Sequence, residues 1–188
     1  MLFRSDFQKG AIEPITRGTY LVTKFGNCYQ HFEDSPEEYV TCKTAFLPDG
    51  RIFVLHNNGK SSIYDSNGSP VWEGEMHYKG FPAQNIAVDR RYLWASFSEE
   101  GAIKRYNLRT MHEELRIGGR ESTFVNPQGL WIDGDFLLVC CARSHKIQIV
   151  NLKTYTVEDF HTFEEPVWQY IKVNSHEFVL LDSGVYKI

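Results

Sequence analysis

One short pattern recurs along this chain at a nearly fixed interval. An acidic or amide residue follows an apolar, strand-like run at Asp49, Asp89, Asp133 and Asn174, directly or, at Asp49, one proline later. These four positions lie 40, 44 and 41 residues apart. A period of about 42 residues, built on the alternation of β-strands, indicates a repeated sheet rather than a single sandwich or a helical solenoid.

The clearest repeat lies between residues 86 and 117. It holds three apolar strands joined by short turns, followed by a more polar segment that alternates enough to form a fourth, outer strand. The next repeat follows the same order, and the corners Asn107–Thr110 and Asn151–Thr154 occupy equivalent places in the two. The strands expected in the clearest repeat are residues 86–89, 92–97, 102–107 and 111–117.

The inner strands of each repeat are apolar on both faces, as expected when every sheet packs between two neighbours. We therefore predict an all-β fold, a β-propeller of about four to five blades, each an antiparallel meander of up to four strands. Aromatic residues at equivalent strand positions are expected in the core between blades: Trp94, Tyr106, Trp131 and Phe136. We expect one domain, residues 1–188, with units at about 13–41, 42–79, 80–123, 124–165 and 166–188.

The last repeat stops after its third strand, Val185–Ile188. An open sheet edge of this kind invites pairing, and natural β proteins cover or close such edges. We expect the amino-terminal segment, either Leu2–Phe7 or Ala11–Ile15, to supply the missing strand and give a closed monomer. The alternative is closure through a homodimer.

Charge and hydropathy argue against two classes of partner. The 24 acidic and 20 basic residues give a net charge of −4 without long runs of either sign, so nucleic-acid binding is not expected. No apolar stretch approaches the ~20 residues of a membrane-spanning helix. Charged residues near Met1 also interrupt any signal-peptide core, so no membrane association or secretion is expected.

The four cysteines, Cys28, Cys42, Cys140 and Cys141, lack the CxxC spacing of a zinc site. The adjacent pair would point to opposite faces of a strand, which disfavours a disulfide between them. We interpret the cysteines as reduced, mostly buried thiols of a cytoplasmic protein.

Two segments, Pro82–Asp89 and Asn126–Asp133, resemble the Pro-x-Gly-hydrophobic-x-Val-Asp opening of NHL-type propeller repeats. A third, Ile63–Glu73, looks like the Asp-x-x-Gly-x-x-x-Trp corner of quinoprotein-type blades. Both resemblances are to repeats that carry many functions, so they imply architecture and no particular activity.

A recurring glutamine is the most specific candidate for a functional site. Gln84, Gln128 and Gln169 lie 44 and 41 residues apart, each shortly after a proline, where the innermost strand of a repeat begins. They are predicted to surround one mouth of the propeller channel. They could hydrogen-bond loop backbone and tie adjacent blades together. Alternatively, they could bind a sugar-like or peptide ligand together with neighbouring side chains, which would give the set Gln84, Asn85, Asn126, Gln128, Trp168 and Gln169.

The repeated carboxylates favour structure over catalysis. Asp49, Asp89 and Asp133 follow the inner strand, at the end opposite the glutamines, where aspartate normally caps a turn. A propeller glycosidase needs two carboxyl groups facing one pocket, and a metal-dependent lactonase needs Glu, Asn and Asp converging at the channel mouth. The possible acidic contributors there are Glu13, Glu164 and Glu165.

These observations favour a non-catalytic binding platform for a protein partner or a small polar ligand at one channel mouth. No cofactor or metal is expected, because the histidines are scattered and form no HExxH or HxH motif. Two alternatives remain: a lactonase-like or glycosidase-like hydrolase or lyase, and a structural or assembly subunit.

Overall fold

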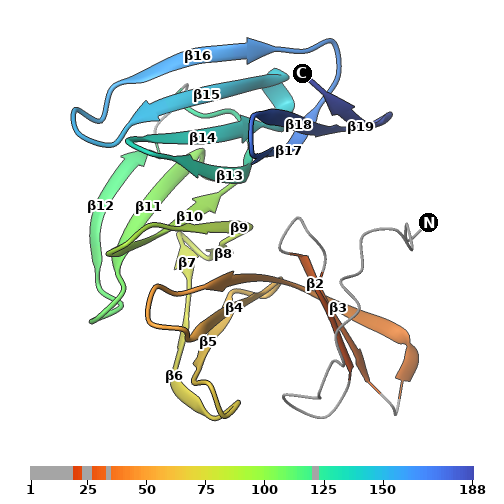
Figure 1. The fold of residues 1–188 in the computed structure, drawn as a ribbon, viewed down its shortest axis with the longest axis vertical. Coiled ribbons are helices and arrows are strands. Elements are labelled where there is room, and N and C mark those ends of the chain that lie inside the picture. The colour runs from red at the N-terminus through yellow and green to blue at the C-terminus, as the bar shows by residue number, and fades with distance from the viewer. Residues whose placement is uncertain (1–18, 23–26, 33–34, 120–122) are drawn as a thin grey trace. The chain divides into compact units, whose positions relative to one another are not determined.

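The computed structural model describes residues 19–22, 27–32, 35–119 and 123–188, with side chains from residue 43 onward. Apart from one 3₁₀ turn, η2 (Ala142–Ser144), the regular elements of these residues are β-strands in antiparallel sheets (Figure 1). The predicted all-β fold of propeller type, built from antiparallel meanders, is confirmed. No described segment forms a helix long and apolar enough to cross a membrane. The chain divides into two compact units, residues 1–76 and 77–188, described separately below.

The first unit contains one six-stranded sheet in which each strand pairs with the next along the chain. The ring of Phe53 stacks against that of Trp72 two strands away, with centroids 6.2 Å apart. The strands are β1 (Thr19–Val22), β2 (Asn27–Phe32), β3 (Ser35–Phe46), β4 (Ile52–His56), β5 (Lys60–Tyr64) and β6 (Pro70–Glu75).

The second unit contains a short hairpin and three larger sheets. Its hairpin joins β7 (His77–Tyr78) to β8 (Phe81–Pro82). The first larger sheet contains β9 (Asn85–Val88), β10 (Tyr92–Phe97), β11 (Ala102–Asn107) and β12 (Glu113–Gly118). The second contains β13 (Pro127–Asp133), β14 (Phe136–Cys141), β15 (Lys146–Asn151) and β16 (Val157–Thr162). The third contains β17 (Val167–Val173), β18 (His176–Leu181) and β19 (Gly184–Lys187).

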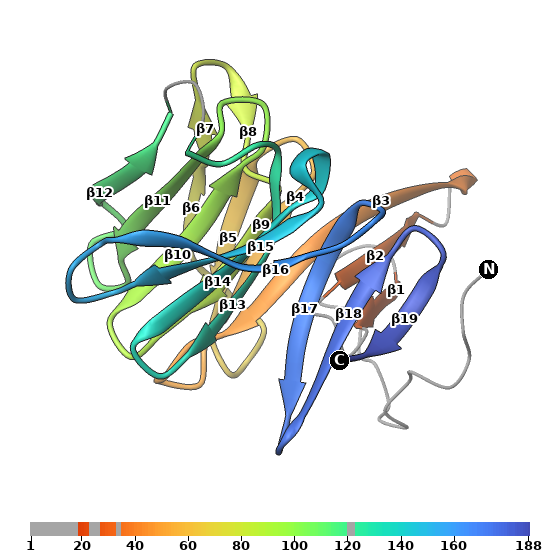
Figure 2. The ribbon, with the colours of Figure 1, turned by 90° about the horizontal axis from the view of Figure 1, so that it is seen from above.

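The three larger sheets of the second unit follow one another in space as they do in sequence. The β13–β16 sheet lies between the other two, with β13 in contact with both β9 and β17 (Figures 1 and 2). The described part of the β17–β19 sheet has three strands, one fewer than its neighbours. The amino-terminal segments expected to complete it lie outside the described residues, so this closure and the division into five repeat units stay predictions.

Apolar side chains fill the spaces between these sheets. One core lies between the β9–β12 and β13–β16 sheets and includes Trp94, Leu137 and Cys141. A second lies on the other face of the β13–β16 sheet and includes Cys140 and Tyr170. Because consecutive strand residues face opposite ways, the adjacent cysteines enter different cores. Both are free, buried thiols, as the sequence predicted.

The expected aromatic core is mostly present. Trp94 and Tyr106 are buried, and Trp131 is partly buried with its ring edge-on to Tyr170. Phe136 was wrongly assigned to this core, because 41% of its surface is exposed. It is the first residue of β14, beside the turn at the end of the sheet, where the neighbouring sheets do not cover it.

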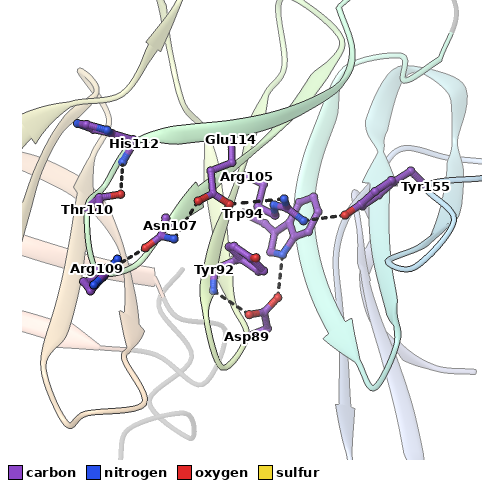
Figure 3. A network of polar contacts seen from close by, with 10 residues as sticks. All are labelled: Asp89, Tyr92, Trp94, Arg105, Asn107, Arg109, Thr110, His112, Glu114 and Tyr155. Carbon is purple, nitrogen blue, oxygen red and sulfur yellow. Dashed lines mark hydrogen bonds and ion pairs between the residues drawn. The ribbon is translucent and has the colours of Figure 1, made fainter.

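The repeated corners of the sequence have the same backbone design. The side-chain Oδ1 of Asp65, Asn107 or Asn151 accepts a hydrogen bond of 2.9 Å from the N–H two residues later (Figure 3 shows Asn107). Each corner also contains a residue with positive φ, a conformation that costs little only for glycine. These residues are Gly68 (76°), Met111 (55°) and Tyr155 (59°).

Candidate binding site

The inner strands of the second unit all begin at the same end of their sheets. These strands are β9, β13 and β17, and the antiparallel order brings the turns β10–β11, β14–β15 and β18–β19 to that end as well. We call it the amide end, because the predicted site residues Gln84, Asn85, Asn126, Gln128, Trp168 and Gln169 lie there. The opposite end carries Asp89 and Asp133 and is called the aspartate end.

Two of the predicted amides meet in the interior. Asn85 and Gln169 are each 8% exposed, and Nδ2 of Asn85 donates a 3.0 Å hydrogen bond to Oε1 of Gln169. The Oδ1 of Asn85 accepts from the backbone N–H of Ile86 at 2.8 Å. The Nε2 of Gln169 donates to the carbonyl of Leu130 at 3.4 Å. These bonds connect the β9–β12 and β17–β19 sheets and engage both amide groups within the protein.

Gly129 of β13 lies directly against this pair. A Cβ at that position would stand 2.6 Å from Oε1 of Gln169 and 2.4 Å from the carbonyl oxygen of Trp168. Only a residue without a side chain allows this approach of two backbones. The sequence contained Gly129 within its NHL-like segment, but the pattern alone did not indicate which residue it would face.

The other two glutamines have local partners. Nε2 of Gln84 donates to the carbonyl of Pro82 at 3.4 Å, and Nε2 of Gln128 donates to Oδ1 of Asn126 at 3.0 Å. The carbonyl of Gln128 also accepts a 2.8 Å hydrogen bond from the Ser96 hydroxyl, which joins β13 to β10. In the described residues, no hydrogen bond connects any two of the three glutamines.

Trp168 lies at the amide end in a more open position. It is 38% exposed, and its indole Nε1 donates to Oδ1 of Asp182 at 2.5 Å. Nearby, Glu165 accepts a 2.8 Å hydrogen bond from the backbone N–H of Ser183. Trp168 therefore presents an aromatic surface at this end while its N–H group is satisfied.

A hollow of about 780 Å³ opens at the amide end, between the β9–β12 and β13–β16 sheets. Two apolar side chains line it, the buried Phe124 and Val125, which is 42% exposed, and most of the other lining side chains are polar. Charged side chains of both signs also line the hollow. The lining residues are Lys79, Ser98, Glu99, Glu100, Gly101, Gly119, Phe124, Val125, Asn126 and Arg143.

The charges of the hollow differ in their partners. Lys79 Nζ and Glu100 Oε2 form an ion pair of 2.6 Å, and this carboxylate raises the pKa of Lys79. Glu99 and Arg143 are exposed, and neither has a hydrogen bond or ion pair from its side chain to another described residue. Sequence reasoning missed these residues, because the turns that carry them do not repeat the same side chains.

The backbone around the hollow is unusual in conformation. Four residues there have the positive φ of the left-handed backbone region: Lys79 (48°), Gly101 (59°), Gly119 (85°) and Asn126 (59°). At Gly101 a Cβ would lie 2.5 Å from the carbonyl oxygen of Phe124, so glycine is required there by space as well as by φ. Left-handed residues other than glycine are uncommon and gather at binding sites more often than elsewhere.

The carboxylates of the repeat have structural partners. Oδ1 of Asp89 accepts from the backbone N–H of Arg91 at 2.7 Å, and Oδ1 of Asp49 accepts from that of Arg51 at 3.2 Å, so both cap turns as predicted. The cap predicted at Asp133 is wrong, because no backbone N–H of the described residues donates to its carboxylate, and its Oδ2 instead forms an ion pair of 2.6 Å with Nζ of Lys172 on the next sheet. The turn after Asp133 has only two residues, and its glycine takes a φ of 60°.

The acidic groups considered for catalysis are not gathered at one place in the described residues. Glu165 bonds to Ser183, and Glu13 lies outside the described residues. Among the residues that the structure describes, no group of three His, Cys, Asp or Glu side chains could hold a metal ion.

A second polar cluster surrounds Arg105 of β11 (Figure 3). Its Nη1 donates to the Tyr155 hydroxyl at 2.7 Å, and its Nη2 lies 3.5 Å from Oε2 of Glu114. The guanidinium carbon lies 4.1 Å from the ring centroid of Tyr92, a cation–π distance. The Arg105 side chain is 16% exposed. The cluster therefore joins the β9–β12 sheet to the β15–β16 corner and leaves little surface for a ligand.

Comparison with known proteins supports the fold and nothing finer. No family model matches the sequence, and no curated protein matches it. Three solved structures are similar at 11–12% identity: U3-55K with a TM-score of 0.66, and the computationally designed proteins Ika8 with 0.61 and Ika4 with 0.60. The matches cover 91%, 92% and 77% of this chain and 57%, 56% and 88% of those proteins, respectively. The chain thus spans little more than half the length of U3-55K and Ika8.

Proposed function

We propose that this protein is a non-catalytic binding platform that holds a peptide segment of a protein partner in the hollow at the amide end. The hollow itself carries the proposal. Its volume of about 780 Å³ falls within the range of ligand sites, and its mostly polar lining includes charges of both signs beside the exposed apolar side chain of Val125. Connecting segments from two adjacent sheets form it, and residues on such segments commonly provide recognition on a rigid scaffold.

Four features favour a peptide over a small polar ligand. Val125 offers exposed apolar surface inside the hollow, and the Nδ2 of Asn126, whose Oδ1 accepts from Gln128, can donate a hydrogen bond. Charges of both signs are available in Glu99 and Arg143. At the same end, the half-exposed Trp168 adds an aromatic surface of the kind enriched in protein interfaces.

A random peptide library tests this proposal. The full chain is used to select binding peptides, and a selected peptide is labelled with fluorescein and titrated by fluorescence anisotropy. Val125→Glu replaces the exposed apolar side chain of the hollow by a charged one and is expected to weaken binding by about tenfold or more. Val173→Glu, at the aspartate end, is the matched control, because Val173 is similarly exposed at 50%.

The result has three readings. Binding that Val125→Glu weakens and Val173→Glu does not is the expected outcome. Selected peptides that bind both variants equally would place recognition elsewhere and contradict the proposal. A library that yields no peptide with a Kd below about 100 µM would also contradict it, and would favour a small polar ligand.

A further inference from the structure

We infer that Glu99 and Arg143 select a peptide that carries one basic and one acidic side chain. This inference rests on the proposed function and concerns the same hollow. The other two charges of the hollow, Lys79 and Glu100, neutralise each other at 2.6 Å. Glu99 and Arg143 remain as exposed charges without a side-chain partner among the described residues. A ligand with one basic and one acidic group could form an ion pair with each of these two side chains.

The two charges lie on equivalent turns of neighbouring sheets. Glu99 belongs to the turn between β10 and β11, and Arg143 to the turn between β14 and β15. In each sheet this turn joins the second strand to the third. A ligand in the hollow therefore meets one charge from each sheet, and the distance between the charges is set by the packing of the sheets.

Both turns are held firmly at their backbones. Next to Glu99, the buried hydroxyl of Ser98 donates a 2.5 Å hydrogen bond to the carbonyl of Pro127 on the other sheet. Next to Arg143, the N–H of the buried Ala142 donates to the carbonyl of Asn126 at 3.0 Å. Fixed backbones reduce the conformational entropy lost on binding, although the charged side chains still rotate.

The chemistry of each group defines its counterpart. The planar guanidinium of Arg143 can form two parallel hydrogen bonds with a carboxylate, a geometry that an ammonium group cannot offer. Glu99 accepts hydrogen bonds and would pair with the ammonium of lysine or the guanidinium of arginine. The exposed Val125 in the same hollow favours an apolar residue in such a peptide.

Charge reversal on both partners tests the inference with the peptides selected above. Arg143→Glu is expected to weaken binding by about tenfold, and replacing the acidic residue of the peptide by lysine should restore most of the loss. Glu99→Lys should behave in the same way with a peptide whose basic residue is replaced by glutamate. Restoration by the swapped peptide shows that the variants are folded.

Matched controls lie away from the hollow. Arg109→Glu changes an exposed arginine at the aspartate end, and Glu158→Lys changes an exposed glutamate of β16. Neither should alter the affinity by more than about twofold, since charges beyond a Debye length of ~8 Å are largely screened at physiological ionic strength.

The failures of the two proposals can be told apart. If peptides bind and Val125→Glu weakens them, but Arg143→Glu and Glu99→Lys do not, the inference is wrong and the proposed function stands. Losses that the swapped peptides do not restore would also overturn the inference. If no peptide binds the unchanged protein, both proposals are wrong.

Discussion

The Nδ2 of Asn85 donates a 3.0 Å hydrogen bond to Oε1 of Gln169, although the two residues are 84 positions apart in the chain. The bond spans from β9 to β17 and passes beside Gly129 of β13, so it involves all three larger sheets of the second unit. Both side chains are buried, and a buried amide without a partner costs free energy. The pair is therefore expected to stabilise the packing of the three sheets.

Gln169→Met should lower the free energy of unfolding by about 2 kcal/mol, because it leaves the buried Nδ2 of Asn85 without its acceptor. Methionine has nearly the same length as glutamine and avoids a large cavity. Gln84→Ala is the control, since Gln84 is partly buried and its side chain makes one long hydrogen bond of 3.4 Å. Urea unfolding measures both, and equal losses would contradict the special role of the Asn85–Gln169 pair.

Gly129→Ala should destabilise the protein by about 3 kcal/mol, at the upper end of the usual cost of overpacking a core. The added methyl group would meet the Trp168 carbonyl oxygen at 2.4 Å and the Gln169 Cα at 2.8 Å, and backbone atoms cannot rotate away. Gly134→Ala is the comparison, because a Cβ at this position would meet no other atom within 4 Å. Its only expected cost is the strain of a non-glycine residue at a φ of 60°. A thermal melt in which Gly134→Ala lost more than Gly129→Ala would argue against this close approach.

The buried thiols predict a stability that falls at alkaline pH. Burial raises the pKa of Cys141 from 9.0 to about 12 and holds that of Cys140 well above 9.0. Above pH 9 the unfolded chain loses these protons while the folded chain keeps them, so rising pH favours unfolding. Each thiol should contribute a slope of up to about 1.4 kcal/mol per pH unit.

Cys141→Ala removes one of these contributions. Its unfolding free energy should therefore decline less steeply than that of the unchanged protein between pH 9 and about 12. Urea titrations at several pH values in that window give the two slopes. Parallel curves would show that the Cys141 thiol is not protected from ionisation in the folded state.

Deleting residues 1–16 tests the closure expected from the sequence. The described β17–β19 sheet has one strand fewer than its two neighbours, and β19 carries the exposed apolar side chains of Val185 and Tyr186. Loss of a covering strand should lower the Tm by more than about 5 °C and promote association through the open edge. An unchanged Tm and an unchanged monomer in size-exclusion chromatography would make the amino-terminal closure wrong.

The sequence was sufficient for the repeating parts of this fold, because regular strands leave a periodic pattern. The corners at Asn107 and Asn151 were recognisable since each uses its own side chain to bond the backbone two residues later. The partner of Asn85 could not be recognised, because no local sequence pattern indicates that β9 and β17 lie close together. Asp133 was misjudged for the same reason, since its partner Lys172 lies on another sheet.

The candidate site was less accessible to sequence reasoning than the fold. Repetition drew attention to the glutamines, whose amides are engaged in hydrogen bonds within the protein. Glu99 and Arg143 lie on turns whose residues differ between repeats, so no periodic signal marks them. Only the packing of two sheets brings these turns to one hollow.

The most direct test of the central claim is to map where a selected peptide binds, using backbone amide chemical shifts of the ¹⁵N-labelled full chain. A peptide held in the hollow should perturb residues 98–101, 125–126 and 143 at the amide end. The amides near Asp89 and Asp133 at the aspartate end should stay unchanged. Perturbations concentrated around Asp89 and Asp133, with residues 98–101 and 143 unaffected, would contradict the account.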